Sequence, residues 1–158
     1  ISVAVECGLP VSPARALLIC CVGVMLCAGA VVAERQVVLV AAATSPLHDL
    51  DSLELRKLYL GYSVRRDGRI VKGLRNTGDE ELNRIFLQAV VAMSEKSYRR
   101  RLLSLPLRQG IPRPSEYDKP EHLLKALSRN PYSVTYMWKE AADRSMDVKT
   151  LKVLWQQD

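Results

Sequence analysis

A continuous apolar run gives the clearest signal of secondary structure in the chain. The segment "QVVLVAAAT", residues 36–44, is apolar at almost every position and is followed by Ser45 and Pro46. A short run rich in β-branched residues predicts a strand buried on both faces, as in a parallel sheet. Residues 150–155, "TLKVLW", alternate apolar and polar positions and predict a last strand.

Four other segments have helical spacing of apolar residues. Asp51 and Glu54 form a capping-box pattern, and Gly61 is typical of a helix end. We expect these inward-facing sets: Leu55, Leu58 and Tyr59; Leu82, Ile85, Phe86, Ala89 and Val90, in a helix ending near Met93; Tyr98, Leu102 and Leu105, in a helix from Ser94 to Pro106; and Leu123, Ala126 and Leu127, in a helix capped by Asp118 with Glu121.

Turn signals separate these helices. Asp67 and Gly68 predict a turn, and residues 69–74 after it read as a short strand. The segment 106–120 is rich in Pro and predicts a loop, whereas "NPYSVTYMW", residues 130–138, predicts a turn and then a strand. Strands that alternate with helices predict one α/β domain over residues 34–158.

The segment before this domain has the composition of a targeting sequence. Arg15 precedes an uncharged apolar run at 16–33 that ends in small residues, and Glu34 follows it. The pattern predicts a signal peptide over residues 1–33, cleaved on export to the periplasm. The alternative is an uncleaved membrane anchor, because eighteen apolar residues can span a bilayer.

Charge and cysteine content narrow the chemistry. All four cysteines lie in residues 1–33, so the rest of the chain has no disulfide, thiol nucleophile or cysteine metal site. Residues 1–33 contain one basic residue, Arg15, and one acidic residue, Glu6, so residues 34–158 keep the net charge of +6. This charge favours anionic partners.

Several other features are given structural interpretations. The sequence contains no Gly-x-Ser-x-Gly elbow, and "HDLD" around His48 is interpreted as a helix cap, so we predict no enzyme, no metal and no cofactor. Nucleic-acid binding is not expected, because the only Phe lies on an apolar helix face. The arginines at 99–101 are expected on a solvated helix face; alternatively they form a basic patch for an acidic partner with Arg65, Arg66, Arg108 and Arg113.

Three segments together resemble a known family. "SLELRKLYLGYSVRRDGRI", "RNTGDEELNRIF" and "NPYSVTYM" are similar, in order and spacing, to the periplasmic phosphate-binding proteins of ABC transporters. The family's tryptophan after the Leu-Gly step is missing here. The resemblance implies a three-layer α/β sheet with helices on both faces, one lobe of a type II periplasmic binding protein.

The resemblance also implies a function. It points to reversible binding of phosphate or another small oxyanion, with a membrane permease or envelope protein as partner. An alternative is an interaction module of an envelope or sensory complex that kept the lobe and lost the anion site. A lobe of this size could also pair with a second copy as a homodimer.

The family's anion loop maps onto residues that only partly suit an anion. Its Arg and Gly correspond to Arg75 and Gly78, Thr77 replaces its acidic residue, and Ser45 or Thr44 would supply the hydroxyl after the first strand. Its Ser-Gly-Thr becomes the acids at 79–81, which accept hydrogen bonds but cannot donate them. This substitution favours a helix start capped by Thr77 or Asp79; the alternative is an anion site formed by Ser45, Arg75, Thr77 and Gly78.

Overall fold

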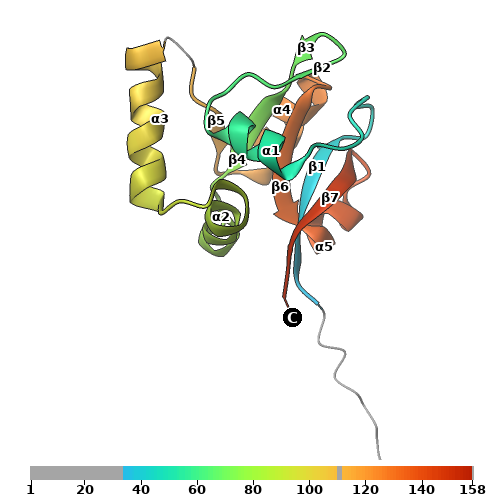
Figure 1. The fold of residues 1–158 in the computed structure, drawn as a ribbon. Coiled ribbons are helices and arrows are strands. Elements are labelled where there is room, and N and C mark those ends of the chain that lie inside the picture. Colours follow the sequence, from blue (N-terminus) through green and yellow to red (C-terminus); the bar gives the residue numbers. More distant parts are fainter. Residues whose placement is uncertain (1–33, 110–111, 158) are drawn as a thin grey trace, which may run out of the picture. The chain divides into compact units, whose positions relative to one another are not determined.

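A five-stranded sheet organises the chain in a computed structural model that describes residues 34–109 and 112–157 (Figure 1). The signal peptide predicted for residues 1–33 lies outside the described residues. The elements in chain order are β1 (Gln36–Ala42), α1 (Ser52–Tyr59), β2 (Arg65–Arg66), β3 (Arg69–Ile70), β4 (Lys72–Asn76), α2 (Glu80–Phe86), the π-helical turn η2 (Leu87–Val91), α3 (Glu95–Gln109), β5 (Ser115–Tyr117), α4 (Pro120–Arg129), β6 (Ser133–Trp138), α5 (Lys139–Arg144) and β7 (Val148–Gln156).

The sheet is mixed, with strand order β5-β4-β6-β1-β7. β4 runs parallel to β5 and β6, whereas β1 is antiparallel to both of its neighbours, β6 and β7. The expectation of a parallel environment for β1 was therefore wrong, although the strand itself is confirmed. The residues of β1 are apolar because helices cover both faces of the sheet. A strand buried on both faces has this composition in either pairing direction, so the sequence does not show whether the pairing is parallel or antiparallel.

Helices on both faces make the fold a three-layer α/β structure, as expected. One face packs Val37, Leu39 and Tyr136 against α1, α2, η2 and α3. The other packs Val38 and Val40 against α4 and α5. Alternate side chains of β1 thus pack into the hydrophobic cores on the two faces of the sheet. In the part of the chain that is described, no helix is long and apolar enough to span a membrane.

The capping box of α1 is confirmed. Asp51 is the N-cap, its carboxylate accepts from the N–H of Ser52, and Glu54 accepts from the N–H of Asp51 in return. The predicted helix end is also confirmed: Gly61 follows the C-cap with a φ of 88°. That conformation favours glycine, and the side chain of Leu105 fills the space where a Cβ would lie.

The π-helical turn changes which residues of the second helix are buried. We expected Ala89 and Val90 to face the core, but Ala89 is exposed and Val90 is only partly buried. Leu87 and Val91 are buried in their place. A π turn inserts one residue into the helical repeat, which moves the apolar face by about one position.

Four boundary predictions fail, three of them around α3 and α4. Pro106 lies inside α3 and does not end it. Asp118 does not cap α4: Lys119 is the N-cap without a side-chain hydrogen bond, and Pro120 begins the helix with its fixed φ. The predicted loop contains β5, and the strand expected over residues 69–74 is divided into β3 and β4.

The π turn buries Val91 and leaves Ala89 exposed, so substitutions at these two positions should lower the free energy of unfolding by different amounts. We expect Val91→Ala to lower the free energy of unfolding by about 2 kcal/mol, because it opens a cavity at a residue that is 0 % exposed. The exposed Ala89→Ser is the matched control and should change it by less than about 0.5 kcal/mol. Urea unfolding measures both, and a larger loss for Ala89→Ser would contradict the register.

Candidate functional site

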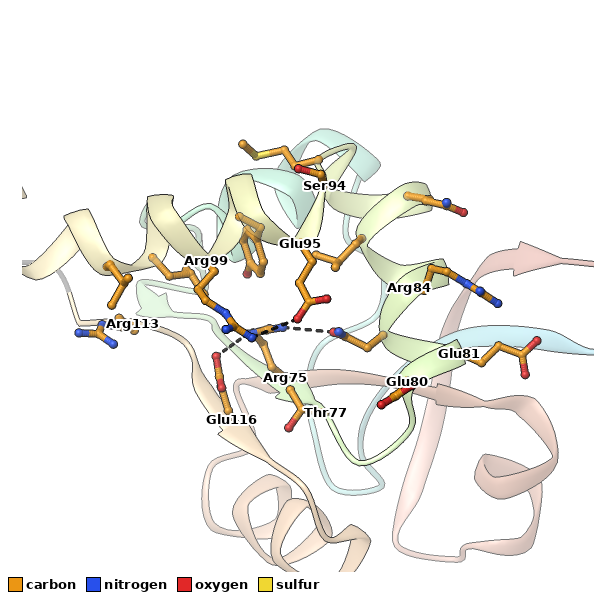
Figure 2. A pocket seen from close by; sticks show the side chains of 17 residues that line it. Arg75, Thr77, Glu80, Glu81, Arg84, Ser94, Glu95, Arg99, Arg113 and Glu116 are labelled. Atoms are coloured by element: carbon orange, nitrogen blue, oxygen red, sulfur yellow. Dashed lines mark hydrogen bonds and ion pairs between the residues drawn. The ribbon is translucent and has the colours of Figure 1, made fainter.

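A cleft of about 1130 Å³ lies beside the loop that the sequence singled out (Figure 2). Its walls come from β4, α2, η2, α3 and β5. Four arginines and four glutamates line it, together with both polar and apolar side chains: Arg75, Arg84, Arg99, Arg113, Glu80, Glu81, Glu95, Glu116, Thr77, Asn83, Leu87, Gln88, Met93, Ser94, Tyr98, Leu102 and Leu103.

Arg75 is the buried charge of this cleft. β4 alternates its side chains, so Leu74 joins the core under α4 and Arg75 faces the opposite side. The Arg75 side chain is only 8 % exposed. Its guanidinium carbon lies 4.9 Å from the centre of the Tyr98 ring, and its Nη2 donates to Oδ1 of Asn83 at 3.1 Å. The strand and two helices therefore hold the guanidinium in place.

The charge of Arg75 is met by Glu116. Nη1 of Arg75 donates to Oε1 of Glu116, which lies opposite it in the parallel pairing of β4 and β5. Glu116 stands on a three-residue edge strand, and its side chain is 52 % exposed. Nε of Arg75 is buried and has no hydrogen-bond partner among the described residues. A confined cation is thus balanced by a carboxylate with access to water.

The loop after β4 is held by backbone contacts. The N–H of Thr77 donates to the carbonyl of Tyr117 at 2.9 Å, and the Thr77 hydroxyl donates to the same oxygen at 3.3 Å. A Cβ on Gly78 would lie 2.1 Å from the carbonyl oxygen of Asp118, so only glycine fits there. Thr77 and Gly78 therefore lie near Arg75 but are engaged with the β5 segment.

Asp79 caps α2, which confirms the predicted self-capped helix start. Its Oδ1 accepts from the N–H of Leu82 at 3.0 Å, and its Oδ2 accepts from Nε1 of Trp138 at 2.8 Å. The Trp138 ring lies under Arg35, at 4.1 Å from the guanidinium carbon to the ring centre. Asp79 thus takes the position that an external anion would need at this helix end.

Ser45 lies at the opposite end of the sheet from Arg75. Ala41 of β1 and Gly73 of β4 both lie beside Val134 of β6. From Val134, β4 runs towards the C-terminal end of β6 and reaches Arg75. The antiparallel β1 runs towards the N-terminal end of β6 and leads to Ser45. The Ser45 hydroxyl donates to the carbonyl of Pro131 and accepts from the N–H of Leu47. The structure therefore brings together Arg75, Thr77 and Gly78, but not Ser45.

Buried tyrosines beside Arg75 stay neutral. Burial raises the pKa of Tyr98 to about 12 and raises the pKa of Tyr136 further. The Tyr98 hydroxyl donates to the carbonyl of Tyr59 at 2.8 Å, and that of Tyr136 donates to the carbonyl of Asn76 at 3.1 Å. These hydroxyls fix the strand and helices around the cleft and are not available as bases.

Sequence reasoning missed the partners of Arg75. Glu116 fell in a segment predicted to be a loop, so its position opposite Arg75 had no signal. Asn83 lies three residues after Glu80 and four before Leu87, and all three line the cleft, so helical spacing was a usable signal. Tyr98 was predicted to face inward, and it does, but its contact with Arg75 depends on tertiary packing.

Comparisons with known proteins give a fold. No protein-family model matches the chain, and no curated protein matches it significantly. An ABC-type phosphate transport receptor from Vibrio cholerae is similar in structure, with a TM-score of 0.55 and 10% identity over 75% of this chain and 46% of that one. PstS from Borrelia burgdorferi gives a TM-score of 0.53 and 11% identity over 75% and 47%.

The chain thus spans about half the length of the solved structures that it matches. At this identity the likeness concerns the fold alone. The mixed sheet with helices on both faces is that of a single lobe of a periplasmic binding protein.

The Asp79 cap predicts a pH-dependent contribution to stability. Burial alone would raise the pKa of Asp79, but the N–H donors of Leu82, Trp138 and Glu81 and the charge of Arg35 outweigh it and lower the pKa below its ordinary value of 3.8. Since the folded-state pKa is the lower one, this stabilisation is present above pH 3.8 and is lost as the pH falls through the folded-state pKa.

Asp79→Ala should therefore cost about 1–2 kcal/mol of unfolding free energy at pH 7 and clearly less at pH 3. Asp49→Ala removes an exposed acid that forms no hydrogen bond with the described residues, and it serves as the control. Denaturant unfolding across pH 7 to 3 measures the difference. A cost for Asp79→Ala that stays constant over this range would contradict the charged cap.

Proposed function

We propose that this chain is an exported, non-catalytic binding domain that takes a small oxyanion reversibly at Arg75. One observation carries the proposal: an arginine whose side chain is only 8 % exposed lines a cleft, and its charge is balanced by a glutamate whose side chain is 52 % exposed. A buried cation needs an anionic partner, because an unpaired charge away from water is costly. Glu116 fills that role from an edge strand.

An external oxyanion can take the place of Glu116. The Glu116 side chain is already 52 % exposed on an edge strand, so it can rotate away from Arg75 into water. An anion in its place would accept from Nη1 of Arg75, while Asn83 keeps its bond to Nη2. The binding energy is the difference between two similar charge-assisted contacts, so the proposal predicts weak binding in the wild-type protein.

The cleft supports binding without chemistry. Its two aliphatic hydroxyl side chains, Thr77 and Ser94, are hydrogen-bonded to the carbonyl of Tyr117 and to the hydroxyl of Ser97. Neither contact pairs a nucleophile with a base. The structural neighbours are named as a phosphate transport receptor and PstS, which makes phosphate one of the anions to test.

Localisation and partners belong to the same proposal. The apolar segment 16–33 after Arg15 supports export to the periplasm. A permease, an envelope protein or a second copy of the chain would then meet the lobe there. The alternative function, an interaction module without a ligand, differs in one respect: it requires the pair of Arg75 and Glu116 to be purely structural.

Removing the internal competitor should strengthen anion binding. We expect Glu116→Gln to bind at least one of phosphate, sulfate and acetate at least tenfold more tightly than wild type, about 1.4 kcal/mol, in titration calorimetry. Glu121→Gln removes an exposed acid of α4 that does not line the cleft, and it should bind as wild type does. Arg75→Gln should abolish binding in the Glu116→Gln background.

Circular dichroism and a thermal melt of each variant separate loss of binding from loss of fold. If a folded Glu116→Gln protein binds none of the three anions more tightly than wild type, the proposal is wrong and the interaction module is favoured. Binding that survives Arg75→Gln would also overturn it, since the anion would then occupy another site.

A further inference from the structure

We infer that the preferred ligand is a singly charged carboxylate attached to an apolar body, and not inorganic phosphate. This inference rests on the proposed function, because it names the chemical class that the Arg75 cleft would take. Four independent features of the cleft carry it: its internal occupant, its hydrogen-bond donors, its charge balance and its apolar wall.

The internal occupant is itself a carboxylate. Oε1 of Glu116 accepts a hydrogen bond from Nη1 of Arg75. Guanidinium and carboxylate groups are planar and match each other in geometry. A ligand that replaces Glu116 with the least rearrangement has the same planar head and the same single charge.

The loop donors that follow Arg75 in the sequence are already engaged within the protein. The Thr77 N–H and hydroxyl both donate to the carbonyl of Tyr117, and the N–H of Leu82 donates to Asp79. The acids Glu80 and Glu81 can only accept hydrogen bonds while ionised. The guanidinium can serve the two oxygens of a carboxylate, whereas the remaining oxygens of a phosphate would need donors from elsewhere in the cleft.

The charges that line the cleft are balanced. Four arginines face four glutamates, and the displaced Glu116 would stay on the rim. Three of these glutamates already pair with arginines: Glu81 with Arg35, Glu95 with Arg99, and Glu116 with Arg75. A monoanion replaces the charge of Glu116 at Arg75, whereas a dianion adds one more negative charge to a lining whose formal charges already cancel.

η2 and α3 contribute several apolar side chains to the wall of the cleft, beside the polar Gln88, Glu95 and Arg99. Leu87 and Leu102 are buried there, Met93 is partly buried, and Leu103 is 49% exposed. A cleft of about 1130 Å³ is far larger than an inorganic anion and is of the order of known small-molecule sites, roughly 300–1,000 Å³. An apolar ligand body would cover Leu103 and remove that exposed surface from water.

A panel of simple anions tests the inference. We would titrate Glu116→Gln with inorganic phosphate, acetate and hexanoate, and with 1-hexanol as an uncharged control. We expect hexanoate to bind at least tenfold more tightly than acetate, and both more tightly than phosphate, with no binding of 1-hexanol. Adding Leu103→Ser should weaken hexanoate binding at least threefold and leave acetate binding unchanged, since Leu103 is 49% exposed and would contact only the apolar body of the ligand.

Each other outcome has a defined meaning. If phosphate binds most tightly and Arg75→Gln removes it, the proposed function stands and this inference is wrong. Hexanoate binding that Leu103→Ser leaves unchanged would refute the apolar contact, and binding of 1-hexanol equal to that of hexanoate would refute the carboxylate. If none of the three anions binds, the proposed function fails along with the inference.

Discussion

A buried guanidinium must have a negative partner, and Arg75 imposes this constraint on the whole cleft. The cation lies where water is largely excluded, with a Tyr98 ring beside it and Asn83 on one nitrogen. Because removal of the charge from water is expensive, some carboxylate or oxyanion has to face it. In this chain Glu116 does so from a short edge strand, and the arrangement of the surrounding elements follows from that pairing.

The architecture explains how the pair is positioned. β4 lies between β5 and β6, so Arg75 is aligned with Glu116 by the strand register. On the same face, α2 supplies Asn83 and α3 supplies Tyr98. Asp79 secures the start of α2 through Leu82 and Trp138, and this carboxylate is the reason that the helix end does not serve as an anion site. In the proposed function, anion binding therefore depends on Arg75.

Local signals in the sequence were sufficient for several elements. The Asp51 box, the Gly61 helix end, β1, β6 and the Asp79 cap all follow from residues close together in the chain. The antiparallel direction of β1 does not, because a strand buried on both faces has the same composition in either direction. That direction is what separates Ser45 from Arg75, so the candidate site could be predicted only in part. The π turn and β5 had no compositional marker, and Glu116 was missed with β5.

This fold thus places a buried arginine at the edge of a cleft and pairs it with a glutamate of the same chain. The most direct measurement is a crystal structure of the Glu116→Gln protein grown with a saturating carboxylate or phosphate. The account predicts an oxyanion within hydrogen-bonding distance of the Arg75 guanidinium, with Asn83 still bound to Nη2 and Asp79 still capping α2. A structure in which the substituted side chain at position 116 stays against Arg75, and the anion lies elsewhere or is not bound, would contradict it.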